Sequence, residues 1–141
     1  MIKHIEYARE WLGTPFHIKG ALKGVGVDCC HVVFDSLARA GVISPIAMPC
    51  YKLDGISDPG REVYPLLLNS VIYPYELQVV SDIQAGDLLI YMFEHRVRHI
   101  AIATTTERQL HTSIRFGVQE NQITDGFKNS LFKIHRIVKN G

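Results

Sequence analysis

The chain has 141 residues, of which 47% are hydrophobic and 21% charged, and its formal net charge is +1. This length predicts a single domain, residues 1–141, with a sizeable core. The balanced charge argues against a nucleic-acid partner, and no apolar run is long enough to span a membrane. Residues 1–7 include charges where a secretory signal needs an apolar stretch, so we expect a chain that is cytoplasmic at synthesis. Three cysteines without a signal suggest thiols rather than disulfides.

Two helices are predicted in the first third of the chain. Apolar residues at helical spacing predict the first over residues 1–12, and Gly13 and Pro15 end it. Residues 16–27 are glycine-rich and predict a loop. Asp28 fits an N-cap, so the second helix is expected over residues 29–40, with Gly41 in the left-handed position that follows a helix. Val27 and Val32 would form a hydrophobic staple across its start, and its core stripe would be Val33, Leu37 and Ala40, with Phe34 beside it.

The middle of the chain predicts a loop and one short helix. Residues 44–60 contain three prolines and two aspartates and predict a loop. Residues 61–71 predict a helix whose apolar side chains are Leu66, Leu67 and Leu68. Proline is tolerated only in the first turn of a helix, so Pro65 limits how early this helix begins.

The second half of the chain predicts antiparallel strands. Residues 88–93 are continuously apolar, as in a strand buried on both faces. A charged turn over 94–98, a strand over 99–103, a turn over 104–108 and a strand over 109–114 follow. Residues 131–138 alternate, with Phe132, Ile134 and Val138 on one side and Lys133 and His135 on the other, which predicts a half-buried strand. Helices followed by an antiparallel meander indicate an α+β fold.

Cys29 is predicted to be a nucleophile because it stands in the first turn of a core helix. A helix N-terminus stabilises a thiolate and lowers the thiol pKa. A thiolate also needs a general base, and the base needs a group that orients it.

A hairpin symmetric about Thr105 would place His99 opposite His111, and a two-residue slip would keep both on one face. Ala101 and Ala103 share that face and leave room for a helix start, while Ile100, Ile102 and Leu110 form the core face. We therefore expect His99 to be the general base for Cys29 and His111 to fix the His99 ring. The backbone N–H of Cys29 would donate to the oxyanion.

Each of these residues also has an ordinary structural interpretation. A cysteine in a helix is usually a small core residue, which is our interpretation of Cys30 and Cys50. Zinc would use the same residue types, but Cys29-Cys30-His31 lacks the ligand spacing of zinc sites. We expect no metal and no cofactor, and it is the joint placement of Cys29, His99 and His111 that favours catalysis.

Four motifs resemble the NlpC/P60 cysteine peptidases. They are Trp11-Leu12-Gly13-Thr14-Pro15-Phe16 with Gly26-Val27-Asp28-Cys29, then Ala85-Gly86-Asp87-Leu88-Leu89, Arg98-His99-Ile100-Ala101-Ile102 and Leu110-His111-Thr112. Their order is that of the family, over nearly the whole chain. Pro49-Cys50-Tyr51 with the following helix, and a closing strand with His135-Arg136, most resemble the short phage-tail and gene-transfer-agent members. Three positions differ from the usual motifs. Phe16 stands where the family usually has Tyr, Cys30 where it has Ser or Ala, and His31 where it has Gly.

The resemblance implies a papain-like α+β fold in which the nucleophile begins a helix packed on an antiparallel sheet. It implies hydrolysis of amide bonds in the stem peptides of bacterial cell-wall peptidoglycan, with Cys29, His99 and His111 at the catalytic positions. For the phage-type members it implies phage tail proteins as partners and incorporation into a virion. Two alternatives stay open: a thiol amidase or acyltransferase on another substrate, and a non-enzymatic binding module of a tail assembly.

Overall fold

The computed structural model describes residues 2–16, 21–22, 26–27, 29–45 and 59–140, and for residues 21–22, 26–27, 29, 59–62 and 98 only the backbone. The helices are α1 (Lys3–Arg9), α2 (Cys29–Arg39), α3 (Pro59–Ser70) and α4 (Asp125–Asn129). The strands are β1 (Ala21–Leu22), β2 (Gly26–Val27), β3 (Tyr75–Val80), β4 (Leu88–Phe93), β5 (Arg96–Ala103), β6 (Arg108–Ser113), β7 (Gly117–Gln122) and β8 (Leu131–Lys139).

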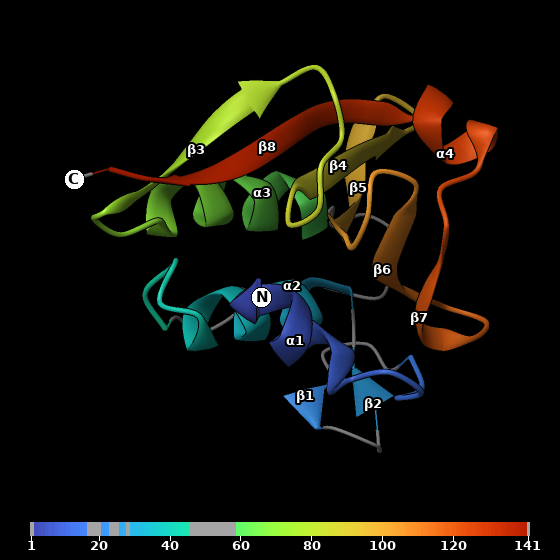
Figure 1. Cartoon of the computed structure of the whole chain (residues 1–141). Helices are drawn as coiled ribbons and strands as arrows, with labels where there is room; N and C mark the ends of the chain where they lie inside the picture. Colours follow the sequence, from blue (N-terminus) through green and yellow to red (C-terminus); the bar gives the residue numbers. More distant parts are fainter. Residues whose placement is uncertain (1, 17–20, 23–25, 28, 46–58, 141) are drawn as a thin grey trace.

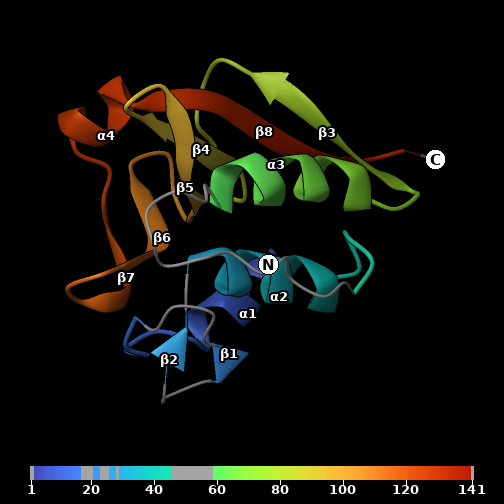
Figure 2. The same ribbon diagram turned by 180° about the vertical axis from the view of Figure 1, so that it is seen from behind.

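An antiparallel sheet forms the centre of the fold. Its strand order is β3-β8-β4-β5-β6-β7, so β4 to β7 form a meander and β8 returns to lie between β3 and β4. Helices α1, α2 and α3 lie together on one side of the sheet, and α4 lies at the end where β8 begins (Figures 1 and 2). This arrangement confirms the α+β class and the antiparallel sheet expected from the sequence.

Two apolar clusters lie on opposite faces of the sheet. The larger joins the three helices to the sheet and includes Val33, Leu37, Leu67, Ile90 and Ile102. The smaller lies under α4 and includes Leu89, Tyr91, Ala101, Ala103 and Ile134. Strand β4 contributes alternate residues to both clusters, which confirms that it is buried on both faces. No helix in the described parts of the chain is long and apolar enough to cross a bilayer.

The end of α2 is as the sequence predicts. Gly41 has a φ of 78°, its N–H donates to Ala38, and the Val42 N–H donates to Leu37 at 2.9 Å. These two bonds form a Schellman motif, which satisfies carbonyls that the last helical turn leaves unpaired. Val33, Leu37 and Phe34 are buried as expected. The predicted N-cap Asp28 and the side chain of Val27 lie outside the described residues.

Helix α3 differs from the prediction. It begins at Pro59, so Pro65 lies inside the helix rather than in its first turn. Proline at the first helical position is favourable, and the buried stripe of Val63 and Leu67 offsets the hydrogen bond lost at Pro65. The three consecutive leucines are not one apolar face, since Leu68 is 42% exposed.

Several elements were not predicted. Strands β3 and β7 and helix α4 have no counterpart in the sequence prediction, and the expected loop over 16–27 contains the short β1–β2 pair. The charged turn after β4 is shorter than expected because Glu94 and His95 both adopt positive φ, 53° and 64°, and reverse the chain in two residues. Strand β5 therefore begins at Arg96.

The burial of β8 differs from the predicted alternation at two positions. Phe132 is 42% exposed, whereas His135 is 5% exposed, and Tyr64 of α3 contacts it through a 2.6 Å hydrogen bond to Nε2. Pairing with β3 on one side and β4 on the other makes β8 an interior strand, which accounts for the buried histidine.

Candidate active site

The β5–β6 hairpin has a different register from the predicted one. Ala103 pairs with Gln109, whereas a turn centred on Thr105 would pair Ala103 with Glu107. The cause is the Thr105 hydroxyl, which accepts the N–H groups of Glu107 and Arg108 and moves the turn forward along the chain. His99 is therefore not directly opposite His111, although the two-residue slip keeps both on one face.

His99 and His111 nevertheless meet across the diverging strands. Their Nε2 and Nδ1 atoms are 2.9 Å apart, and their rings are close to perpendicular, at 80°. A register shift in the β4–β5 ladder beside Tyr91 leaves Arg98 as an extra residue next to His99. Such a bulge bends its strand and redirects the neighbouring side chain.

A third polar side chain completes a row across three strands. His111 Nε2 lies 3.1 Å from Oδ1 of Asn121 on β7, and Asn121 Nδ2 lies 3.3 Å from Oε1 of Gln119. Asn121 was missed in the sequence because β7 was not predicted there. The signal that could have revealed this part of the site is Thr124, which caps α4 as a threonine before a helix commonly does.

The row faces a cleft of about 240 Å³. Its polar wall is formed by His99, His111, Thr112 and Ser113, and its apolar wall by Phe93, Ile114 and Phe127. The ring of Phe127 on α4 lies 5.3 Å from that of His111 and 6.2 Å from that of His99. Phe127 thus covers one side of the pair and restricts its contact with water.

The expected approach of the second helix over Ala101 and Ala103 is wrong. Phe127 and its neighbours fill that face, while α2 packs on the opposite face through the cluster that contains Ile100 and Ile102. The first turn of α2 lies beside β6 in both Figure 1 and Figure 2, at the end of the sheet. Cys29 is the first residue of α2, but its side chain lies outside the described structure.

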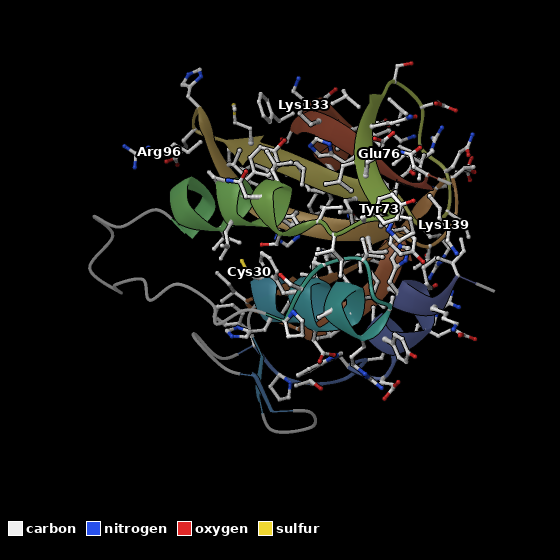
Figure 3. The ribbon with its side chains drawn as sticks, turned by 90° about the vertical axis from the view of Figure 1, so that its left-hand side faces the viewer. Cys30, Tyr73, Glu76, Arg96, Lys133 and Lys139 are labelled. Atoms are coloured by element: carbon white, nitrogen blue, oxygen red, sulfur yellow. The ribbon has the colours of Figure 1, made fainter. Side chains whose placement is uncertain are left out.

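The structure describes the three residues that differ from the usual NlpC/P60 motifs. Cys30 is 6% exposed and points from the first turn of α2 towards α3 (Figure 3), which confirms that it is a core residue. His31 and Phe16 are half-buried. Cys50 lies outside the described residues.

Hydrogen bonds connect the tryptophan motif, residues 11–16, to both α2 and β7. Trp11 donates from Nε1 to Asp35 at 2.9 Å, which ties this segment to α2. The Gly13 N–H donates to Val118, and the Val118 N–H donates to Thr14 at 2.9 Å, which pairs the segment with β7. The motif thus connects the helix that begins at Cys29 with the strand that supplies Asn121.

The Gly-Asp motif before β4 anchors β8. Asp87 is 1% exposed and accepts two hydrogen bonds from Arg136, at 3.1 and 2.9 Å, and one from the Gln84 N–H at 2.8 Å. A buried carboxylate needs such a set of donors. This motif therefore has a structural role and lies outside the histidine row.

The electrostatics keep His111 neutral. Burial, together with the charge on His99, lowers the pKa of His111 to about 4, and the hydrogen bond with Asn121 opposes this. A neutral imidazole can accept a hydrogen bond from His99 and stays an acceptor when His99 takes up a proton. The pair can therefore act as a base with an uncharged orienting group.

Buried neutral histidines predict that the fold weakens in mild acid. Burial also lowers the pKa of His4 and of His135, so the folded chain binds fewer protons than the unfolded chain. Stability should then be full above pH about 6.5 and fall as the pH drops towards about 4, with His111 contributing up to about 3 kcal/mol. Urea unfolding midpoints between pH 7.5 and 5 measure this. His111→Gln should flatten the dependence, whereas a wild-type midpoint that stays constant over this range would contradict it.

Within the described ranges, no group of three or more His, Cys, Asp or Glu side chains is placed to hold a metal ion.

Comparisons with known proteins identify the fold. No family model matches the chain, and no curated protein does. Among solved structures, it resembles an NLP/P60 family protein similar to lipoprotein from Staphylococcus aureus (20% identity, TM-score 0.65) and an NlpC/P60 family protein from Bacillus cereus (19%, 0.61). These matches cover 98% and 95% of this chain but only 41% and 39% of those proteins. The chain thus spans less than half their length.

A third match is of comparable size. The NlpC/P60 domain of the peptidoglycan hydrolase SagA is 18% identical with a TM-score of 0.60, and the match covers 95% of this chain and 96% of that domain. The three likenesses show that the chain has the α+β fold of NlpC/P60 proteins.

Proposed function

We propose that the protein is a cysteine hydrolase that cleaves amide bonds in the stem peptides of bacterial peptidoglycan. The observation that carries the proposal is the 2.9 Å contact between His99 and His111 beside a cleft, in a fold where Cys29 begins a helix. The likeness to the domain of a peptidoglycan hydrolase supports the choice of substrate.

In the proposed reaction, His99 takes the proton of the Cys29 thiol. The thiolate attacks the peptide carbonyl, and the backbone N–H of Cys29 donates to the oxyanion. Collapse of the intermediate breaks the C–N bond, and the His99 imidazolium protonates the leaving amine. Water, activated by His99, then hydrolyses the thioester and restores the thiol.

Digestion of purified wall peptides tests this proposal. The expected result is a new amine and a new carboxyl at one bond of the stem peptide, identified by mass spectrometry, with no product from the Cys29→Ala variant. If the folded wild-type protein cleaves none of these peptides, the proposal is contradicted. The result would favour a thiol enzyme that acts on another amide or ester, or a non-enzymatic binding module.

We also propose that the chain acts as a component of a phage tail. The support is the sequence resemblance of Pro49-Cys50-Tyr51 and His135-Arg136 to the short phage members. The first of these motifs lies outside the described residues, and Arg136 anchors Asp87. Copurification with assembled tails from an infected culture would test it, and a chain found only in the tail-free fraction would argue against it.

A further inference from the structure

We propose that Asn121 is a positioning residue that sets the tautomers of His111 and His99 and so keeps the Nδ1 lone pair of His99 available for the Cys29 proton. The inference rests on the proposed function, since it describes how the base of that site is prepared. It assigns a role in the site to β7, the edge strand of the sheet that also pairs with residues 13–14.

The Asn121 amide has one of two possible orientations in this structure. Its Nδ2 can only donate, and it faces Oε1 of Gln119 at 3.3 Å, so Oδ1 is the atom directed at His111. Oδ1 can only accept, and it lies 3.1 Å from His111 Nε2. His111 Nε2 must therefore carry a hydrogen.

That hydrogen determines the state of both rings. His111 is 5% exposed and neutral, so it has one N–H, and its Nδ1 must be an acceptor. His111 Nδ1 lies 2.9 Å from His99 Nε2, so His99 donates from Nε2. In the neutral form of His99 the lone pair is then on Nδ1, the nitrogen that this row leaves unused.

Proton transfer then needs no rearrangement. When His99 Nδ1 accepts the thiol proton, His99 becomes a cation and keeps the same Nε2–H bond to His111. That bond becomes charge-assisted, which strengthens it as the charge appears. His111 and Asn121 keep their positions and their hydrogen atoms.

The opposite amide orientation would disable the base. If the amides of Asn121 and Gln119 both turned over, Asn121 would donate to His111 Nε2. His111 would then donate from Nδ1 to His99 Nε2, and His99 Nδ1 would carry the hydrogen. Both arrangements satisfy every bond in the row, so the side-chain amide decides which nitrogen of His99 is basic.

Nitrogen-15 NMR of labelled histidines tests the assignment without any substrate. The Cys29→Ala background is used so that no thiolate holds a proton on His99, and spectra are recorded at pH 8. We expect Nε2–H tautomers for both His111 and His99. Asn121→Asp, which keeps an acceptor, should preserve them, and Asn121→Leu should give mixed tautomers. An Nδ1–H tautomer of His111 with Asn121 in place, or tautomers unchanged in Asn121→Leu, would overturn the proposal.

The consequence for reactivity is measured on the protein with Cys29 intact. We expect Asn121→Leu to slow alkylation of Cys29 by iodoacetamide at pH 6, where an unassisted thiol is almost entirely protonated, by about twofold or more, because mixed tautomers leave only part of the protein with a basic His99 Nδ1. Asn121→Asp should restore most of the rate. Gln122→Ala, on the exposed side of the same strand, is the matched control and should react like wild type. Equal rates for Asn121→Leu and wild type would contradict the positioning role. A protein with the expected tautomers that cleaves no wall peptide would contradict only the proposed substrate.

Discussion

Cys29 is expected to react with iodoacetamide at a rate that changes less than about threefold between pH 8 and pH 6. An ordinary thiol, with a pKa of about 8.5, loses roughly tenfold in rate per pH unit in this range because only its thiolate reacts. A thiolate at the start of α2, paired with a protonated His99, would remain populated at pH 6. His99→Ala removes that partner and should restore the steep dependence of an ordinary thiol.

The thiols of Cys30 and Cys50 serve as internal references in the same experiment. Cys30 is 6% exposed in the core and should react at least about tenfold more slowly than Cys29 at pH 7, as judged by mass spectrometry of the labelled peptides. His95→Asn is the matched histidine control, because His95 is exposed on the β4–β5 turn and asparagine tolerates its positive φ. Equally slow labelling of all three cysteines would mean that Cys29 is not activated.

The largest stability loss is expected from Gly117→Ala, at roughly 3 kcal/mol. Gly117 has a φ of 74°, and a Cβ placed there would lie 2.2 Å from the Thr14 carbonyl oxygen and 2.9 Å from the Pro15 Cα. Both are backbone atoms, so the segment paired with Val118 would have to move away from β7. The left-handed backbone contributes about 1–2 kcal/mol of this loss, and the overlap contributes the remainder.

Two other glycines separate these contributions. Gly41 has a φ of 78° with nothing within 4 Å of an added Cβ, so Gly41→Ala should cost only the backbone term, about 1–2 kcal/mol. Gly126 is helical and its nearest neighbour would lie 3.8 Å away, so Gly126→Ala should be neutral or slightly stabilising. Chemical denaturation of the three variants gives the order, and a Gly117→Ala protein as stable as Gly41→Ala would contradict the close approach of β7 to residues 14–15.

The sequence predicted the parts of this fold that depend on local patterns. The apolar run of β4 and the Gly41 helix end follow from periodicity and backbone preference, and the structure has both. The common face of His99 and His111 follows from strand alternation, which a slip of two residues does not change.

The parts that were missed depend on contacts between distant segments. The hairpin register was set by the Thr105 hydroxyl, and the position of Pro65 was decided by the burial of Val63 and Leu67. Asn121 has no sequence signal of its own, because its role arises only when β7 pairs with β6. Local patterns do not contain these contacts, which form when the sheet and the helices pack together.

Cys29 and His99 are proposed to cleave a wall peptide together. This is tested by kcat/KM for stem-peptide cleavage by wild type, Cys29→Ala, His99→Ala and the control His95→Asn. We predict no cleavage by Cys29→Ala, a loss of about 10³-fold or more for His99→Ala, and a wild-type value for His95→Asn. Cleavage by His99→Ala at more than a tenth of the wild-type rate, or persistent cleavage by Cys29→Ala, would contradict the proposal.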